Sequence, residues 1–181
     1  MVYVFLAEGF EETEAIAPID ILRRAGLEVV TVGVGGQLVR GSHDVTVMAD
    51  IDAAQAEPDE TVEAVVLPGG MPGTLNLEKS AVVQRFLDYA AENGRVIAAI
   101  CAAPSILGHK HLLEGKRAVC FPGYEKELFG ASVQDTAAEI DGNVVTGCGA
   151  GAALDFGFAL VERLCGRSAR KQLEQAMQCG R

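Results

Sequence analysis

The stretch RVIAAICAAPSIL, at residues 95–107, decides the predicted fold. Residues 95–100 form a short apolar run, which is typical of a strand buried on both faces of a parallel sheet. Cys101 follows this run directly, and residues 102–107 are predicted to form a short helix. A strand, a sharp turn and a helix in this order make a nucleophile elbow, which exposes the side chain at its turn. The stretch therefore predicts an α/β fold with Cys101 at the elbow.

Apolar runs alternate with helical patterns on both sides of this stretch. Strands are predicted at residues 2–7, 27–34, 63–67, 116–121 and 143–146, with further short pieces within 38–49. Helices are predicted at residues 13–24, 80–92 and 152–164, and a last helix, capped by Ser168, is predicted to end near residue 177. Pro18 is expected to kink the first helix or to mark a later start.

Strands separated by helices favour right-handed βαβ units, and therefore a mostly parallel sheet between helical layers. No internal repeat, low-complexity segment or linker is visible, so residues 1–181 are predicted to form one α/β sandwich domain. Ligands of such sheets bind at the carboxyl ends of the strands. Cys101 and the loops at residues 8–14, 68–70 and 147–151 are expected to face one another there.

The composition narrows the classes of partner and the compartment. Lys and Arg number 15 and Asp and Glu number 25, which gives a net charge of −10. Because an acidic chain repels phosphate backbones, this charge argues against nucleic acid as a partner. No apolar run approaches the ~20 residues of a membrane span, and no secretory signal is visible. The expected location is therefore the cytoplasm, without a membrane.

The cysteines stand at positions 101, 120, 148, 165 and 179. Their odd number, wide spacing and lack of a C-x-x-C pair argue against a structural zinc site and against a disulfide framework. We expect Cys120, Cys165 and Cys179 to be packing or surface residues. Cys148, in a glycine-rich loop, is expected to be a neighbour of Cys101. No metal is predicted.

Cys101 is the strongest candidate for chemistry. Unpaired N–H groups and the dipole at a helix N-terminus stabilise a thiolate, so the pKa of Cys101 is expected to be depressed. The N–H of the following residue is positioned to bind an oxyanion. The alternative is a buried core cysteine, which is also common, and position alone leaves both interpretations open.

Two neighbouring loops carry groups that suit such a cysteine. Glu8, Glu11, Glu12 and Glu14 stand near a helix N-terminus, where acidic residues are favoured in any case. One of these carboxyls could act as an acid or base beside Cys101, but their spacing does not choose among them. Gly69 and Gly70 could bring N–H groups close to a ligand, or could simply form a tight turn.

Two other features of the sequence are weaker indications of a functional site. The sequence GCGAGA at residues 147–152 loosely fits the dinucleotide pattern G-x-G-x-x-G/A, which raises the alternative of a nucleotide-binding module. However, the acidic residue expected about 20 positions on is Glu174, inside a predicted helix, so close helix–strand packing is favoured instead. Among the histidines, His43 stands in a loop that is expected to lie near the site, and none has metal-ligand spacing.

Five segments together resemble one family. They are AEGFEETEA at residues 7–15, IDILRRAG at 19–26, VVLPGGMPGTLNL at 65–77, VIAAICAAPSIL at 96–107 and TGCGAGAALDFGFALVERL at 146–164. In their order and spacing they resemble the ThiJ/PfpI superfamily, in the branch of the parkinsonism-associated deglycase and its bacterial relatives. The resemblance covers nearly the whole chain.

The resemblance implies a flavodoxin-like three-layer sandwich, commonly assembled as a homodimer, with no cofactor. It implies that Cys101 is the reactive cysteine and that Glu14 is the glutamate whose protonated carboxyl binds it. Gly70 and Ala102 match the positions whose N–H groups form an oxyanion pocket. Gly69, His43 and Cys148 are expected nearby.

Four positions differ from patterns seen among relatives. Phe121 stands where some relatives have a histidine, and Ala102 replaces the histidine that follows the cysteine in the protease-like branch. Without a histidine beside the cysteine, a Cys-His protease is not expected. His43 and Cys148 stand where arginines occur in some relatives, which argues against anion recognition by those arginines.

The resemblance implies a glutathione-independent glyoxalase or a protein deglycase. Cys101 would attack methylglyoxal, glyoxal or their early protein adducts, and hydroxy acids would be the products. The main alternative is a redox-sensing stress protein, oxidised at Cys101 without turnover. Both functions use the same residues, so the sequence does not separate them.

Overall fold

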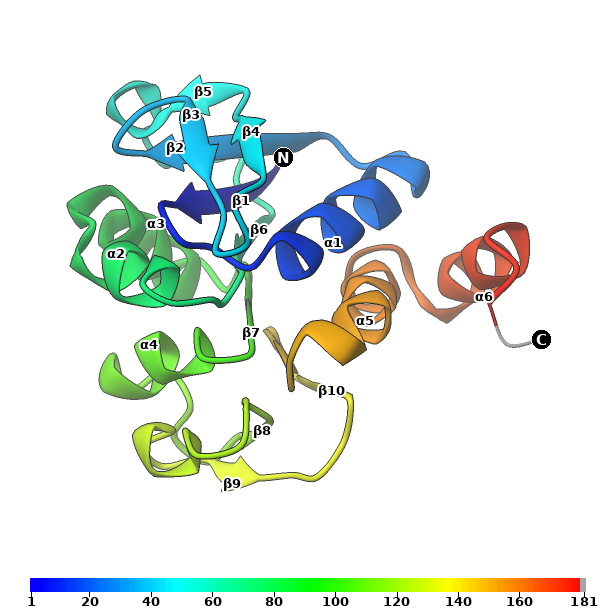
Figure 1. The fold of residues 1–181 in the computed structure, drawn as a ribbon. Helices are drawn as coiled ribbons and strands as arrows, with labels where there is room; N and C mark the ends of the chain where they lie inside the picture. Colours follow the sequence, from blue (N-terminus) through cyan, green and yellow to red (C-terminus); the bar gives the residue numbers. More distant parts are fainter. Residues whose placement is uncertain (180–181) are drawn as a thin grey trace.

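The computed structural model describes residues 1–179 and has a seven-stranded sheet at its centre (Figure 1). The strand order is β10-β11-β7-β6-β1-β2-β5, in which β10 is antiparallel to β11 and every other pair is parallel. This architecture confirms the predicted flavodoxin-like α/β fold with its mostly parallel sheet. No helix within residues 1–179 is both long enough and apolar enough to cross a membrane.

The helices and strands follow in chain order. The sheet strands are β1 (Val2–Ala7), β2 (Val29–Val34), β5 (Ile51–Asp52), β6 (Ala64–Leu67), β7 (Val96–Ile100), β10 (Ala138–Asp141) and β11 (Val144–Gly147). Two small sheets pair β3 (Leu38–Arg40) with β4 (Thr46–Met48), and β8 (Arg117–Ala118) with β9 (Ser132–Val133). The α-helices are α1 (Glu12–Arg24), α2 (Gly73–Lys79), α3 (Ala81–Glu92), α4 (Pro104–His109), α5 (Ala153–Cys165) and α6 (Arg167–Ala176). Short 3₁₀ turns are η1 (Ala53–Gln55), η2 (Glu125–Glu127) and η3 (Ala150–Ala152).

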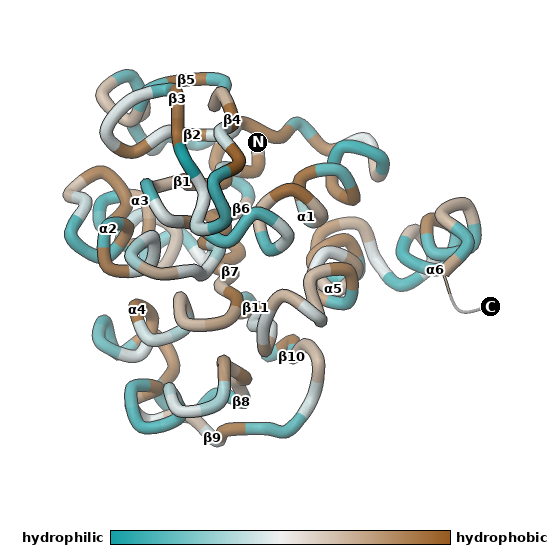
Figure 2. The backbone as a smooth tube through the Cα atoms, in the orientation of Figure 1, coloured by the Kyte–Doolittle hydropathy of each residue, from teal (hydrophilic) through white to brown (hydrophobic). Residues whose placement is uncertain are grey.

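Helices cover both faces of the sheet, because the central strands carry apolar side chains on both sides. On one face Phe86 of α3 packs on Tyr3 and Phe5 of β1, in a core that also includes residues of α2 and α4. On the other face α1 and α5 pack with Val4 and Val145 in a second core. The apolar residues of the central strands lie between these helical layers (Figure 2). Packing of the three layers fixes the positions of the strand ends relative to one another.

The register of the parallel strands brings the predicted loops together. Leu67 of β6 pairs with Ala99, and Ile100 of β7 pairs with Gly147 of β11. The loops after β1, β6, β7 and β11 therefore leave the sheet at the same edge, as expected for a ligand site of an open α/β sheet.

Two helix boundaries differ from the prediction. Helix α1 begins at Glu12 and runs through Pro18, so Pro18 neither delays its start nor ends it. Packing against α5 holds this part of the helix: a Cβ on Gly157 would lie 3.3 Å from the Pro18 Cα. Helix α6 begins at Arg167, and Gly166, at φ 89°, is its N-cap. Ser168 therefore lies inside the helix, and its predicted capping role is wrong.

Other local predictions also change. Only Arg117–Ala118 of the predicted strand at 116–121 forms β8, and α4 begins at Pro104, two residues later than expected. The sequence reasoning missed α2, which begins at Gly73. A Cβ at that position would lie 2.6 Å from the Phe10 backbone nitrogen, so α2 packs closely on the loop after β1. Because this contact joins α2 to a loop more than 60 positions earlier in the chain, no local sequence pattern predicts it.

His109 ties the end of α4 to two other elements. Its ring nitrogens contact Glu78 of α2 and, at 3.0 Å, Glu127 of η2. These hydrogen bonds raise the pKa of His109 above its usual 6.5. The ion pairs therefore stabilise the fold fully below pH 6.5, and this contribution is lost as pH rises through the raised pKa. We expect His109→Ala to lower the melting temperature more at pH 6 than at pH 9.

The matched control is His111→Ala, since His111 is more exposed and its ring contacts Glu114 within the same loop. Thermal unfolding of both variants at the two pH values measures the effect. An equal loss for His109→Ala at both pH values would contradict this prediction.

Candidate active site

Cys101 lies in a sharp turn between β7 and α4. Its φ of 66° places a non-glycine residue in the left-handed region, a strained conformation that neighbouring contacts must hold. The Cys101 N–H donates to the Gly147 carbonyl at 2.9 Å, and the Cys101 carbonyl accepts from the Phe121 N–H at 2.8 Å. The turn therefore has the geometry of the predicted nucleophile elbow.

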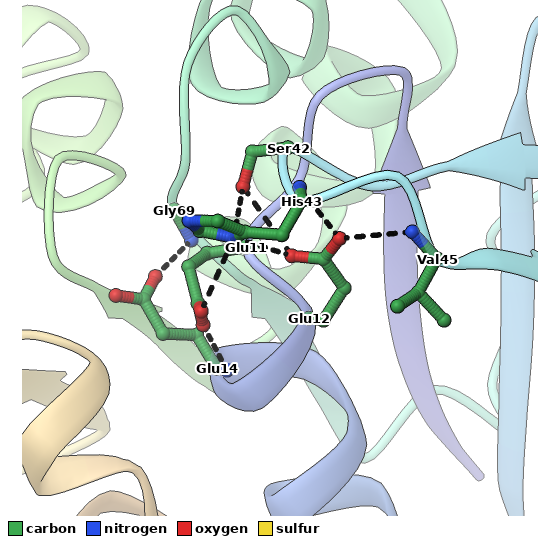
Figure 3. Close-up of polar contacts among 7 residues, drawn as sticks. All are labelled: Glu11, Glu12, Glu14, Ser42, His43, Val45 and Gly69. Atoms are coloured by element: carbon green, nitrogen blue, oxygen red, sulfur yellow. Dashed lines mark hydrogen bonds and ion pairs between the residues drawn. The ribbon is translucent and has the colours of Figure 1, made fainter.

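Glu14 reaches Cys101 from the first turn of α1. Its side chain is buried, with the residue 1% exposed, and it shares a hydrogen bond with the Cys101 thiol. The Gly69 N–H donates to the Glu14 Oε2 at 2.9 Å (Figure 3). The Glu11 side chain caps the helix by accepting from the Glu14 N–H at 2.7 Å. The glutamate indicated by the family resemblance is thus the one that faces Cys101.

Burial controls the titration of this pair. Burial raises the pKa of the Glu14 carboxyl to about 7, against opposing hydrogen bonds from Cys101 and Gly69. Burial, together with the adjacent Glu14 carboxylate, raises the pKa of the Cys101 thiol to about 12. The expected depression of the Cys101 pKa is therefore wrong, because desolvation and a neighbouring negative charge outweigh the local backbone donors.

The two groups titrate as a pair because they share a hydrogen bond. Between pH about 7 and pH about 12 the pair holds one negative charge and one proton. A thiolate on Cys101 beside a protonated Glu14 is one of the two arrangements of that charge. The pair can therefore present a nucleophile together with an acid.

Backbone donors complete the surroundings of the sulfur. The N–H groups of Gly70 and Ala102 donate to the Cys101 sulfur, which favours its ionised form. Gly70 has a φ of 89°, and a Cβ there would lie 2.4 Å from the Glu11 backbone nitrogen. Glycine is therefore required at this position to bring its N–H to the sulfur. Both residues predicted to form an oxyanion pocket therefore lie beside Cys101, and their binding of an oxyanion stays a prediction.

Gly69 lies against both members of the pair and leaves no room for a side chain. A Cβ on Gly69 would lie 2.7 Å from the Cys101 Cβ and 2.7 Å from the Glu14 Oε2. We expect Gly69→Ala to push the two side chains apart and to lower any Cys101-dependent turnover by about 10- to 100-fold. The measurement is kcat/KM on methylglyoxal, with folding checked by circular dichroism.

Gly151→Ala is the matched control, because a Cβ on Gly151 meets no atom within 4 Å among the described residues. It should leave turnover unchanged. Full activity in folded Gly69→Ala would show that close Glu14–Cys101 contact is not needed.

His43 lies next to Glu12 rather than in contact with Cys101. Its ring Nδ1 is 3.0 Å from one oxygen of the Glu12 carboxylate, and its backbone N–H donates to the other oxygen at 2.7 Å. Burial opposes ionisation of Glu12, but these bonds and one from the Val45 N–H lower its pKa to about 2. The side-chain ligand atoms of Glu11, Glu12 and His43 lie within 4.8 Å of one another. Helix capping and loop contacts already account for these carboxylates (Figure 3).

The glycine-rich loop has a packing role. A Cβ on Gly147 would lie 2.9 Å from the Ile100 side chain and 3.1 Å from the Phe156 Cβ, so glycine lets α5 approach the sheet. Glu174 lies in α6 and pairs with Arg170 at 2.7 Å, away from a strand end. These contacts favour helix–strand packing over the dinucleotide pattern. Cys148, at the start of this loop, lines a separate cavity with Cys120.

The fold and the elbow define a class: a flavodoxin-like α/β protein with a cysteine–glutamate pair at the carboxyl edge of its sheet. The sequence profile of the DJ-1/PfpI family matches residues 1–163. The chain belongs to the DJ-1/PfpI family.

Individual relatives agree with this assignment. Protein dj-1beta of Drosophila melanogaster is 36% identical over 177 residues, covering 96% of this chain and 94% of the relative. A protein of Pyrococcus abyssi named as a deglycase is 33% identical over 148 residues, covering 80% of this chain and 87% of the relative. The structure of oxidized Toxoplasma gondii DJ-1 has a TM-score of 0.94 and 33% identity, and the match covers 99% of this chain and 98% of that one.

Proposed function

We propose that this protein is a cofactor-independent cysteine enzyme of the glyoxalase or deglycase type. The observation that carries the proposal is the Cys101–Glu14 pair, with Glu14 at a pKa of about 7 and two backbone N–H groups on the sulfur. A general acid–base group works best when its pKa lies near the working pH. The deglycase name of the Pyrococcus abyssi relative supports the same chemistry.

The reaction begins with attack of the Cys101 sulfur on the aldehyde carbon of methylglyoxal or glyoxal. The carbonyl π bond breaks as the S–C bond forms, and its oxygen becomes an oxyanion. Because the N–H groups of Gly70 and Ala102 point at the sulfur, they lie within reach of that oxygen. Glu14 donates its proton to the oxyanion, which yields a neutral hemithioacetal.

Glu14 then acts as a base and as an acid in turn. It removes the proton from the former aldehyde carbon, which gives an enediolate. The hydroxyl proton on the first oxygen passes to the oxygen of the adjacent carbon, and Glu14 returns its own proton to that adjacent carbon. The product is a thioester of a hydroxy acid on Cys101. Water hydrolyses this thioester, releasing lactate from methylglyoxal, or glycolate from glyoxal, and restoring the thiol. The same steps on a hemithioacetal or aminocarbinol adduct of another protein amount to deglycation.

The test is lactate formation from methylglyoxal by the purified protein, without glutathione and with a metal chelator present. We expect stoichiometric conversion to lactate over many turnovers. In D₂O, deuterium should appear at carbon 2 of the lactate, because the proton on Glu14 exchanges with solvent. Absence of lactate with folded protein would overturn the glyoxalase form of the proposal, and an assay on glycated peptides would then test the deglycase form.

The second candidate is a redox sensor that is oxidised at Cys101 without turnover. It is favoured by one observation, the oxidized state of the similar Toxoplasma gondii structure. A sulfinate at Cys101 could accept hydrogen bonds from protonated Glu14 and from the same two N–H groups. Stoichiometric oxidation of Cys101 by peroxide, in a protein that forms no lactate, would support this candidate over the enzyme.

We propose a homodimer as the assembly and a small dicarbonyl or a glycated protein as the partner in the reaction. The cytoplasmic location stays a prediction from the sequence. Light scattering of the purified chain measures the assembly directly.

A further inference from the structure

Two cysteines outside the proposed catalytic pair face one cavity. This cavity has a volume of about 630 Å³ and lies between the segment after β8 and the loops at the edge of β10 and β11. Its lining includes Cys120, Cys148, Glu125, Val133 and Asp135. Both cysteines are free thiols. The sequence predicts a packing or surface position for Cys120 and a place near Cys101 for Cys148.

Contacts on both sides of Cys120 place it beside Cys148. The residue before it, Val119, donates its N–H to the Thr146 hydroxyl at 2.9 Å, and Thr146 stands two positions before Cys148. The residue after it, Phe121, contacts the position that follows Cys148, since a Cβ on Gly149 would lie 3.2 Å from the Phe121 ring. The two short segments therefore run side by side, with the cysteines between the two contacts.

The alternation of β11 directs Cys148 toward this segment. Successive side chains of a strand point to opposite faces, so Thr146 and Cys148 share a face. Thr146 contacts Val119 on that face, whereas a Cβ on the intervening Gly147 would meet Ile100 and Phe156 on the other. The ladder continues past the strand end, because the Cys148 N–H donates to the Ala137 carbonyl at 3.0 Å.

The Cys101 side chain points elsewhere, although the Cys101 N–H binds the carbonyl of Gly147, the residue before Cys148. Its side chain bonds Glu14 and packs with the core formed by α1 and α5. Cys120 belongs to the core on the opposite face of the sheet. Cys120, and not Cys101, is the cysteine that lines the same cavity as Cys148.

We propose that Cys120 and Cys148 form a reversible disulfide when the protein meets a peroxide. Cys148 is the more exposed thiol and reacts first. Its thiolate attacks the O–O bond, which gives a sulfenic acid and releases one water after protonation. The Cys120 sulfur then attacks the sulfenic sulfur, the S–O bond breaks, and the Cys120 proton leaves with the hydroxyl as a second water. The peroxide is reduced by two electrons, and the two thiols are oxidised to one disulfide.

The surroundings of Cys120 fit the role of the second thiol. Burial and the nearby Glu125 carboxylate raise its pKa to about 11, so it stays protonated and unreactive toward peroxide at neutral pH. The disulfide would attach the segment after β8 to β11. That segment holds Phe121, whose N–H binds the Cys101 carbonyl, so the bond would lie directly beside the elbow.

Tryptic mapping tests the proposal directly, because each of the five cysteines falls on a different tryptic peptide. Cys120 lies on residues 118–126, Cys148 on 127–163 and Cys101 on 96–110. The protein is treated with hydrogen peroxide, free thiols are alkylated, and the digest is analysed by mass spectrometry without reduction. We expect peptides 118–126 and 127–163 to appear linked, two hydrogens lighter than their sum, and to separate after dithiothreitol.

Two cysteine variants test whether the linked peptides come from a Cys120–Cys148 disulfide. Cys148→Ser should abolish the linked pair and leave Cys120 open to alkylation after unfolding, and Cys165→Ser, at an exposed position, should retain the pair. Oxidation of Cys101 is counted separately on its own peptide, so the enzyme and redox-sensor functions do not affect the readout. Full alkylation of both Cys120 and Cys148 after peroxide, a link from Cys148 to peptide 96–110, or terminal oxidation of each cysteine alone would overturn the proposal.

Discussion

Substitution of Cys101 by serine is expected to abolish lactate formation from methylglyoxal, with turnover falling by about 10³-fold or more. The exchange replaces one atom, so the N–H groups of Gly70 and Ala102 keep an acceptor. A serine hydroxyl in this turn has a far higher pKa than a thiol, and the Glu14 carboxyl is too weak a base to ionise it. The site would keep its shape and lose its nucleophile.

The measurement is the initial rate of lactate release, with the melting temperature as the check on folding. Cys165→Ser is the matched control, since Cys165 is exposed at the end of α5. It should turn over methylglyoxal at the wild-type rate. If folded Cys101→Ser retained a tenth of that rate, another group would have to supply the nucleophile.

Replacement of Glu14 by glutamine should lower turnover by about 10²- to 10⁴-fold, the usual contribution of a general acid–base group. The amide has nearly the shape of the carboxyl, and its oxygen can still accept the Gly69 N–H. It cannot take a proton from carbon or return one. The loss should therefore appear in kcat, and alkylation of Cys101 should persist. Unchanged turnover would remove Glu14 from the proton transfers.

The same substitution should stabilise the fold, but only at higher pH. Burial raises the pKa of Glu14 from 4.5 to about 7 in the folded protein. A raised pKa favours folding fully below pH 4.5, and this advantage is lost as pH rises through about 7. At pH 8 the wild-type protein holds a buried charge that glutamine removes, so Glu14→Gln should gain up to about 3 kcal/mol. At pH 4.5 the gain should vanish.

Urea unfolding at the two pH values measures this difference. Glu8→Gln is the control, because Glu8 is an exposed carboxyl of the same loop, and its effect should stay within about 0.5 kcal/mol at both. A Glu14→Gln variant that is equally stable relative to wild type at both pH values would contradict a raised Glu14 pKa.

Local patterns in the sequence determined much of the fold. The apolar runs of β1, β6 and β7 and the amphipathic pattern of α3, with Ser80 as its N-cap, are properties of neighbouring residues. The run that ends at Cys101 identified the elbow for the same reason. Short elements with weak patterns, such as α2 and β8, depend on contacts with distant loops and could not be predicted in this way.

The candidate site was determined only in part by the sequence. Cys101 followed from its place after a buried strand, but spacing could not choose among four glutamates, and the family resemblance supplied Glu14. Tertiary structure brought Glu14 into the site, since Gly69, whose N–H binds the Glu14 carboxyl, is 55 positions away in the sequence. Tertiary structure also decided how Cys101 titrates. Burial and the nearby Glu14 carboxylate raise the pKa of Cys101, whereas its position before a helix predicts a lowered pKa. The same holds for Cys120 and Cys148, which line one cavity because the segment after β8 lies against β11. Desolvation and long-range proximity arise from packing between distant segments, so a local sequence pattern does not contain them.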